Sequence, residues 1–116
     1  MGLTIGSTAA DVPPQWGSPV KGPVLVGKET YTVAAYPAGK LLLVREGEIR
    51  MILVREGYEG RSARGLTIGR TADEVWERYG SPTRQVELTQ GHSWSYDTQR
   101  IAFQLRDGKV ISWLLF

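Results

Sequence analysis

The chain has 116 residues, of which 41% are hydrophobic and 22% charged, and this composition suits one domain with a single buried core. Its 14 Lys and Arg residues nearly balance 12 Asp and Glu residues, so no basic stripe for nucleic acid is evident. The absence of cysteine excludes disulfides, thiolate metal ligands and cysteine nucleophiles. No apolar run is long enough to cross a bilayer, and we expect no membrane insertion.

One segment of the sequence occurs twice. Residues 65–82 align with residues 2–19 at an offset of 63 (65 − 2), and 11 of the 18 aligned positions are identical. Such internal similarity indicates a duplicated unit. We therefore expect a single domain over residues 1–116, composed of a first repeat (2–54), a linker (55–64) and a second repeat (65–116).

Each copy of this segment has the signals of a short helix. In the second copy, Thr71 and Glu74 have the spacing of a capping box, and Gly80 is placed to end the helix. In the first copy, Thr8 takes the capping position, and Pro13 predicts that the helix ends near residue 12. The second helix has an apolar stripe that needs a partner surface, formed by Ala72, Val75, Trp76 and Tyr79.

The residues that follow each predicted helix have β-strand character. Eight predicted strands cover residues 23–26, 30–36, 41–44, 49–54, 84–88, 93–96, 101–105 and 110–116. Glu46-Gly47 and Asp107-Gly108 are typical of tight hairpin turns. The predicted fold class is α+β: a tandem repeat of a helix followed by three to four antiparallel strands, with two helices packed on one face of a roughly eight-stranded antiparallel sheet. The apolar residues 113–116 predict that the last strand lies inside the sheet or is covered.

A sequence motif links both repeats to a known superfamily. Gly-Leu-Thr-Ile-Gly-x-Thr-x-x-x-Val and then Gly-Ser-Pro begin each repeat, and a Trp/Tyr strand and an Asp-Gly-Lys-Val hairpin follow the second copy. In this pattern the chain resembles the β-lactamase-inhibitory-protein and SmpA/OmlA group of envelope modules. It is also similar to the duplicated module associated with bacterial CAP (cysteine-rich secretory) domains. The matching positions are fold residues: Gly6, Thr8, Val12, Gly17, Pro19, Gly69, Thr71, Val75, Gly80 and Pro82.

This resemblance covers nearly the whole chain and implies a binding or scaffolding module that acts in the cell envelope or outside the cell. The sequence departs from the group in three ways. It lacks the disulfides of the inhibitors and the lipidated cysteine of the envelope lipoproteins, and it has consecutive prolines in the first helix. It contains no signal peptide, and the compartment stays open.

His92 is the only histidine and the only candidate for a catalytic base. A base needs a nucleophile within hydrogen-bond reach, and Ser93, the next residue on a strand, would point to the opposite face. Asp73 and Glu74 have structural positions at a helix N-terminus. We therefore predict no catalytic residue, no metal site and no cofactor, with a small enzyme that uses His92 as a remote alternative.

Aromatic residues on the predicted strands, with arginines between them, have three possible uses: the core, a protein-binding face or base stacking. We predict a non-enzymatic protein-binding or envelope scaffolding module, and we expect no nucleic acid and no small-molecule cofactor. The alternative is a self-associating structural domain, a homodimer through an open sheet face or edge. The predicted contact residues are Tyr31, Tyr36, Trp94, Tyr96 and Trp113.

Overall fold

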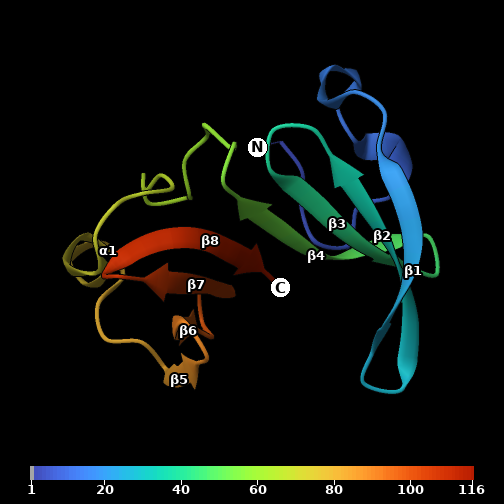
Figure 1. Cartoon of the computed structure of the whole chain (residues 1–116). Helices are drawn as coiled ribbons and strands as arrows, with labels where there is room; N and C mark the ends of the chain where they lie inside the picture. The colour runs from blue at the N-terminus through green and yellow to red at the C-terminus, as the bar shows by residue number, and fades with distance from the viewer. Residues whose placement is uncertain (1) are drawn as a thin grey trace.

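The computed structural model describes residues 2–116 and contains eight β-strands. These are β1 (Val20–Val26), β2 (Glu29–Tyr36), β3 (Lys40–Arg45), β4 (Glu48–Arg55), β5 (Arg84–Leu88), β6 (Gly91–Tyr96), β7 (Ile101–Arg106) and β8 (Lys109–Leu115). They form one antiparallel sheet in the order β1-β2-β3-β4-β8-β7-β6-β5 (Figure 1). The eight predicted strands and their antiparallel arrangement are confirmed.

The helices correct the predicted fold class. Residues 2–116 contain one α-helix, α1 (Ala72–Tyr79), and the first predicted helix is replaced by two 3-10 turns, η1 (Ala9–Asp11) and η2 (Pro14–Trp16). Pro13 explains the difference, because it donates no backbone hydrogen bond and disfavours a helical conformation at Val12, which is extended (φ −66°, ψ 126°). The protein is therefore mainly β, and the prediction of two helices on the sheet is wrong.

Local signals explain why α1 forms where it does. The hydroxyl of Thr71 accepts a hydrogen bond from the Glu74 amide at 3.2 Å, and Gly80 ends the helix with a φ of 79°. Val75 and Tyr79 bury their side chains against the sheet. Trp76, which the sequence places on the same apolar stripe, is instead 46% exposed. A helix of only eight residues depends on these contacts with the sheet.

The two tight turns predicted from sequence are present. Glu46 and Gly47 have φ angles of 54° and 77°, and Asp107 and Gly108 have φ angles of 51° and 72°. Two consecutive positive φ angles are the property of type I′ turns, whose twist matches that of the flanking strands. These turns connect β3 to β4 and β7 to β8.

β4 and β8 join the two halves of the chain at the centre of the sheet. Their antiparallel pairing runs from Ile52 opposite Leu115 to Arg55 opposite Ser112. β1–β3 lie on one side of this pair and β5–β7 lie on the other (Figure 1). The C-terminal strand is therefore internal, as its apolar sequence predicts.

Each half ties its N-terminal segment to a central strand by the same backbone bond. The Gly6 amide donates to the carbonyl of Ile49 at 2.8 Å, and the Gly69 amide donates to the carbonyl of Val110 at 2.8 Å. The two glycines also have nearly equal positive φ angles, 92° for Gly6 and 93° for Gly69. These bonds hold η1 and α1, respectively, at equivalent ends of β4 and β8.

The core lies on one side of the sheet, which we call the covered face. η1, η2, residues 56–71 and α1 pack against this face in two clusters, and Leu115 contacts both clusters. The larger cluster surrounds α1 and comprises Val54, Leu66, Val75, Tyr79, Tyr96, Ile101, Phe103, Leu105, Val110 and Trp113. The smaller cluster surrounds the N-terminal segment and comprises Leu3, Ala34, Leu42, Ile49 and Ile52.

The first residue of the predicted linker, Arg55, belongs to β4, and residues 56–64 contain no helix or strand, but side-chain hydrogen bonds fix this segment to α1. The Tyr79 hydroxyl donates to the Ser62 hydroxyl at 2.9 Å, which also accepts the Leu66 amide at 3.1 Å. Arg64 donates to the carbonyl of Arg78 at 3.1 Å, and Arg78 donates to the carbonyl of Arg64 at 2.9 Å. This segment is therefore part of the folded domain.

We expect Gly91→Ala to lower the free energy of unfolding by about 3 kcal/mol, because a β-carbon at this position overlaps the backbone carbonyl of Leu105 and φ is 152°. Gly108→Ala is the control for a positive φ without a close approach: its φ of 72° lies in the left-handed region that Ala adopts at modest cost, open space surrounds it, and we expect a loss of about 1 kcal/mol. Urea unfolding measures both. Equal losses would contradict the close approach of β6 and β7 at residue 91.

Candidate functional site

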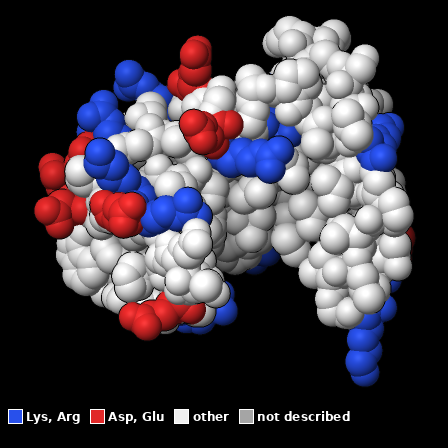
Figure 2. Space-filling view, in the orientation of Figure 1, with Lys and Arg blue, Asp and Glu red and all other residues white. Residues whose placement is uncertain are grey.

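The face of the sheet opposite the covered face, here called the open face, is the candidate functional site. Within residues 2–116, the helix and the 3-10 turns pack on the covered face, and no second layer lies on the open face (Figure 1). The sheet is strongly twisted, and the space-filling surface is hollowed between its two halves (Figure 2). α1 and the two 3-10 turns lie on the outer sides of these halves, so the open face lines the hollow.

The first half of the open face is apolar. Strand register places one partly exposed aliphatic or aromatic side chain after another on β1 to β4 and on β8. An antiparallel sheet that exposes one face to water normally presents polar residues there. The apolar residues are Val24, Tyr31, Val33, Ala35, Leu41, Leu43, Met51, Leu53 and Leu114.

In the second half of the open face, polar side chains lie on β6, β7 and β8. Ser93 and Ser95 on β6, Gln104 on β7 and Ser112 on β8 share this face. The Ser112 hydroxyl donates to the side-chain oxygen of Gln104 at 2.7 Å, and this bond orients both groups. The open face thus combines an apolar region with adjacent hydrogen-bonding groups, and this combination is typical of protein interfaces.

Of the five predicted contact residues, Tyr31 is the one on the open face. Its ring is partly exposed, and the guanidinium carbon of Arg45 lies 5.9 Å from the ring centroid. Glu29 forms an ion pair with the same arginine at 2.6 Å. Tyr31 therefore stands at one end of the apolar region, next to an Arg–Glu pair.

Tyr36 and Trp94 lie on the covered face and are partly exposed there. The Tyr36 ring packs edge-on against Trp16 of η2 with a centroid distance of 5.4 Å. Trp94 packs edge-on against Trp76 of α1 with a centroid distance of 5.8 Å. Both residues therefore belong to local aromatic contacts, on opposite halves of the sheet.

Tyr96 and Trp113 are core residues. They are 2% and 1% exposed, and both belong to the cluster around α1. Trp113 packs against Phe103 at 6.0 Å and Tyr58 at 5.8 Å, while the Tyr96 hydroxyl donates to the Gly80 carbonyl at 2.9 Å. These two side chains do not reach the surface, and the five predicted residues do not form one site.

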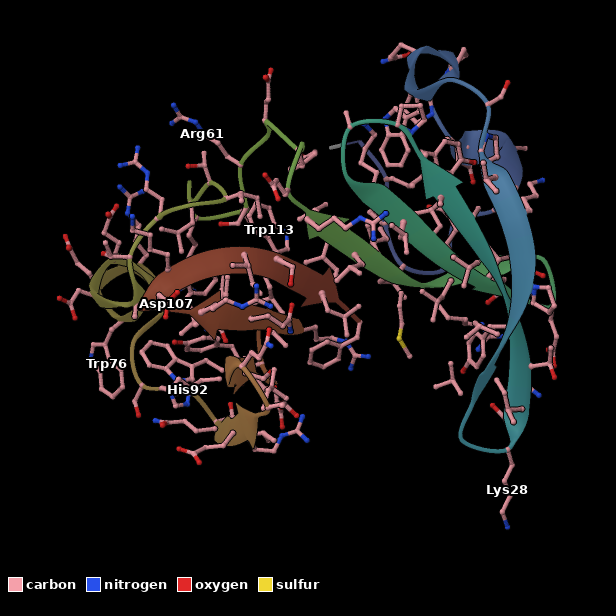
Figure 3. The ribbon with its side chains drawn as sticks, in the orientation of Figure 1. Lys28, Arg61, Trp76, His92, Asp107 and Trp113 are labelled. Atoms are coloured by element: carbon pink, nitrogen blue, oxygen red, sulfur yellow. The ribbon has the colours of Figure 1, made fainter. Side chains whose placement is uncertain are left out.

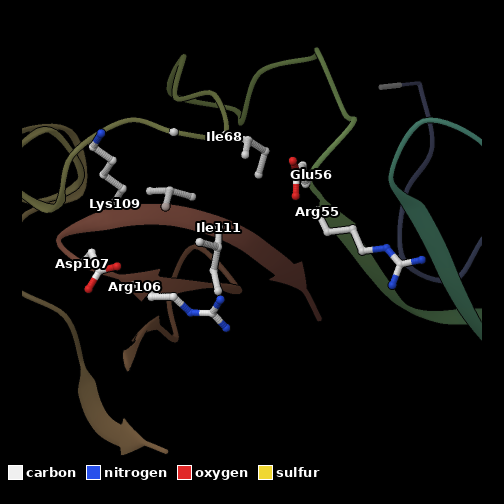
Figure 4. A pocket seen from close by; sticks show the side chains of 9 residues that line it. Arg55, Glu56, Ile68, Arg106, Asp107, Lys109 and Ile111 are labelled. Atoms are coloured by element: carbon white, nitrogen blue, oxygen red, sulfur yellow. The ribbon is translucent and has the colours of Figure 1, made fainter. Parts of the chain in front are cut away.

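A cavity of about 680 Å³ lies where β4 leaves the sheet beside β8. Ile68, Val110 and Ile111 form its apolar wall (Figure 4). Figure 4 shows the charged ends of Arg55 and Lys109 directed away from Ile111, whereas Arg106 lies beside Ile111. The remaining lining residues are Glu56, Gly69 and Asp107. The lining therefore combines three aliphatic side chains with five charged ones.

His92 lies on β6, with its side chain 56% exposed. Its Nδ1 atom is 4.0 Å from a carboxylate oxygen of Glu87, directly across the strand pair. Ser93 points to the open face and His92 to the covered face, as strand alternation predicts. In the part of the chain that the structure describes, no group of three or more His, Asp or Glu residues is arranged to hold a metal ion.

An aromatic corner near His92 was not predicted from the sequence. Trp76 of α1 and Trp94 of β6 form it, and Figure 3 shows Trp76 and His92 on the same side of the molecule. The amphipathic pattern of α1 gave no signal for it, because it placed Trp76 among residues that face the core.

Comparison of the chain with protein-family models, with curated protein sequences and with solved structures gives no match. The similarity to β-lactamase-inhibitory proteins and SmpA/OmlA modules therefore stays a prediction. No helix of residues 2–116 combines the length and apolarity needed to cross a membrane.

We expect stability to fall as the pH rises from about 10 to about 12, because burial, and secondarily the neighbouring Tyr79, raises the pKa of Tyr96 from 10.0 to about 12. In this window the unfolded chain releases the Tyr96 proton and the folded chain retains it, which favours unfolding. Tyr96→Phe should flatten this decrease and cost about 1 kcal/mol at neutral pH through loss of the hydrogen bond to Gly80. Tyr31→Phe is the exposed control. Equal pH profiles for wild type and Tyr96→Phe, measured by chemical unfolding, would contradict this placement of Tyr96.

Proposed function

We propose that this chain is a non-enzymatic protein-binding module that holds its partner on the open face. The observation that supports the proposal most directly is the row of nine partly exposed apolar side chains that no other element of residues 2–116 covers. Monomeric proteins rarely leave such contiguous apolar regions on their surface unless they bind something there. A partner that removes them from water gains roughly 25 cal/mol per Å² of apolar area.

The shape and composition of the open face favour a protein partner over a small ligand. The hollow between the two halves is wide and open, and its visible surface carries few charged side chains (Figure 2). Small-molecule sites instead enclose most of the ligand surface. The serines and Gln104 beside the apolar region supply hydrogen bonds for the polar rim that protein interfaces need. We propose that a loop or small domain of the partner fills the hollow.

The site of action that we propose is the cell envelope or the extracellular space. This proposal rests on the resemblance of the repeated Gly-Leu-Thr-Ile-Gly motif to that of the envelope modules. In the enzymatic alternative His92 would be the base, and within residues 2–116 its side chain lies 4.0 Å from the carboxylate of Glu87.

We expect affinity capture from an envelope fraction to retain one or more proteins on the wild-type chain and about tenfold less of them on the double variant Val33→Thr, Met51→Gln. Both substitutions keep the approximate side-chain size while making the centre of the open face polar. Leu25→Gln is the matched control, since Leu25 is 69% exposed and points to the opposite face of the sheet. Capture that is equal for all three baits would count against the open face as the contact surface.

Self-association is the alternative use of the same surface, and light scattering separates the two. We expect the mass of one chain across micromolar concentrations, because the open face is concave and two concave surfaces do not fit together. A stable dimer that Val33→Thr, Met51→Gln converts to monomer would instead establish self-association through this face.

A further inference from the structure

β5 is an open sheet edge with little protection. It pairs only with β6, and all five of its residues are exposed. The opposite edge strand, β1, carries Pro23, a residue that blocks the addition of further strands. β5 contains no proline and no bulge in its pairing with β6.

The hairpin geometry shows which backbone groups of β5 face outward. A two-residue loop, Thr89 and Gln90, connects β5 to β6, so Leu88 and Gly91 form the hydrogen-bonded pair that closes the hairpin. Hydrogen-bonded and non-hydrogen-bonded pairs alternate along an antiparallel ladder. The N–H and C=O groups of Gln85 and Glu87 therefore point toward the free edge.

The side chains beside this edge differ on the two faces. On the open-face side, Val86 and Leu88 are 52% and 47% exposed. On the covered-face side lie Glu87, whose side chain is 88% exposed, and the aromatic corner of Trp76 and Trp94. An added strand would thus meet aliphatic groups on one side and a carboxylate with indole rings on the other.

We propose that β5 accepts an extended strand of a partner protein in which aliphatic residues alternate with Lys or Arg. The backbone groups of Gln85 and Glu87 would pair with the added strand, in the manner of β-strand addition. Its aliphatic residues would lie beside Val86 and Leu88, and its cations would lie beside Glu87. This surface is centred on the β5 edge; Val86 and Leu88 lie on the open face but outside the row of nine apolar residues proposed above as the main binding site.

Charge supports a cationic partner strand. Among residues 2–116, His92 is the one basic side chain within 4.0 Å of the Glu87 carboxylate, so this carboxylate is free to meet a cation of an added strand. Arg84, the one cation of β5, is held by Asp97 at 2.9 Å on the open-face side. A Lys or Arg over the exposed ring of Trp76 also gains cation–π attraction, which is strongest with indole.

A second copy of this chain fits the edge less well. Two β5 strands paired antiparallel about Val86 would place Glu87 opposite Gln85 of the second copy, with no cation opposite either carboxylate. Opposite charges across strands stabilise pairing, and that contribution is missing from this arrangement. We therefore expect the strand added at β5 to come from a different protein.

The probe that tests the proposal is the peptide acetyl-Gly-Lys-Val-Lys-Val-Lys-Gly-amide, titrated to millimolar concentration into the nitrogen-15-labelled chain. We expect amide shifts and slowed hydrogen exchange at Gln85 and Glu87 but not along β1. Gln85→Pro removes one outward N–H and should abolish binding, while the control Gln85→Thr should retain it. Glu87→Gln should weaken binding about threefold, and added salt should weaken it further.

Three results would overturn the proposal. These are unchanged β5 amides at millimolar peptide, equal binding by Gln85→Pro and Gln85→Thr, and equal binding of the acidic counterpart acetyl-Gly-Glu-Val-Glu-Val-Glu-Gly-amide. A dispersed spectrum of the free Gln85→Pro variant shows that its fold is intact; if it unfolds, Glu87→Pro and Glu87→Thr serve as the matched pair for the second outward N–H. Shifts at Leu43 and Met51 with none at β5 would overturn this inference and leave the open-face proposal standing.

Discussion

The pairing of β4 with β8 is the interaction on which the rest of this structure depends. Four residue pairs, from Ile52–Leu115 to Arg55–Ser112, turn two meanders into one continuous sheet. Each meander alone would bury only one small cluster, and domains of about 60 residues or fewer are marginally stable. Because the sheet is continuous, Leu115 packs against both clusters and couples them. The internal position of β8 leaves β1 and β5 as the two free edges.

A one-sided core follows from this arrangement. η1, η2, residues 56–71 and α1 pack on the covered face, so the opposite face is left to water although its first half is apolar. The strong twist then brings the outer strands of the two halves around a hollow (Figure 2). The open face and the β5 edge are consequences of the same topology, yet they offer different chemistry. One presents aliphatic groups beside hydroxyls, and the other presents backbone donors and acceptors beside carboxylates and indoles.

The sequence predicts the strands well because their signals are local. Alternating patterns and the Glu46-Gly47 and Asp107-Gly108 turns depend on neighbouring residues alone. The first helix was predicted from the capping signal at Thr8, and that cap forms with Asp11, but Pro13 ends the helical segment after the short 3-10 turn η1. The contact residues were not predictable in the same way, because the face on which a strand residue lies depends on register. Tyr96 and Trp113 are thus buried. Leu43 and Met51 line the open face, although apolar side chains of this kind are usually expected in the core.

The central claim is that the open face is accessible in solution and ready to receive a partner. Methyl NMR spectra with a soluble paramagnetic relaxation agent test it most directly. The account predicts strong relaxation enhancement at the methyl groups of Val33, Leu43, Met51 and Leu53, and weak enhancement at Ile49 and Ile52 on the covered face. Equal protection of both sets of methyl groups would show that the open face is covered in the free protein, and would contradict the account.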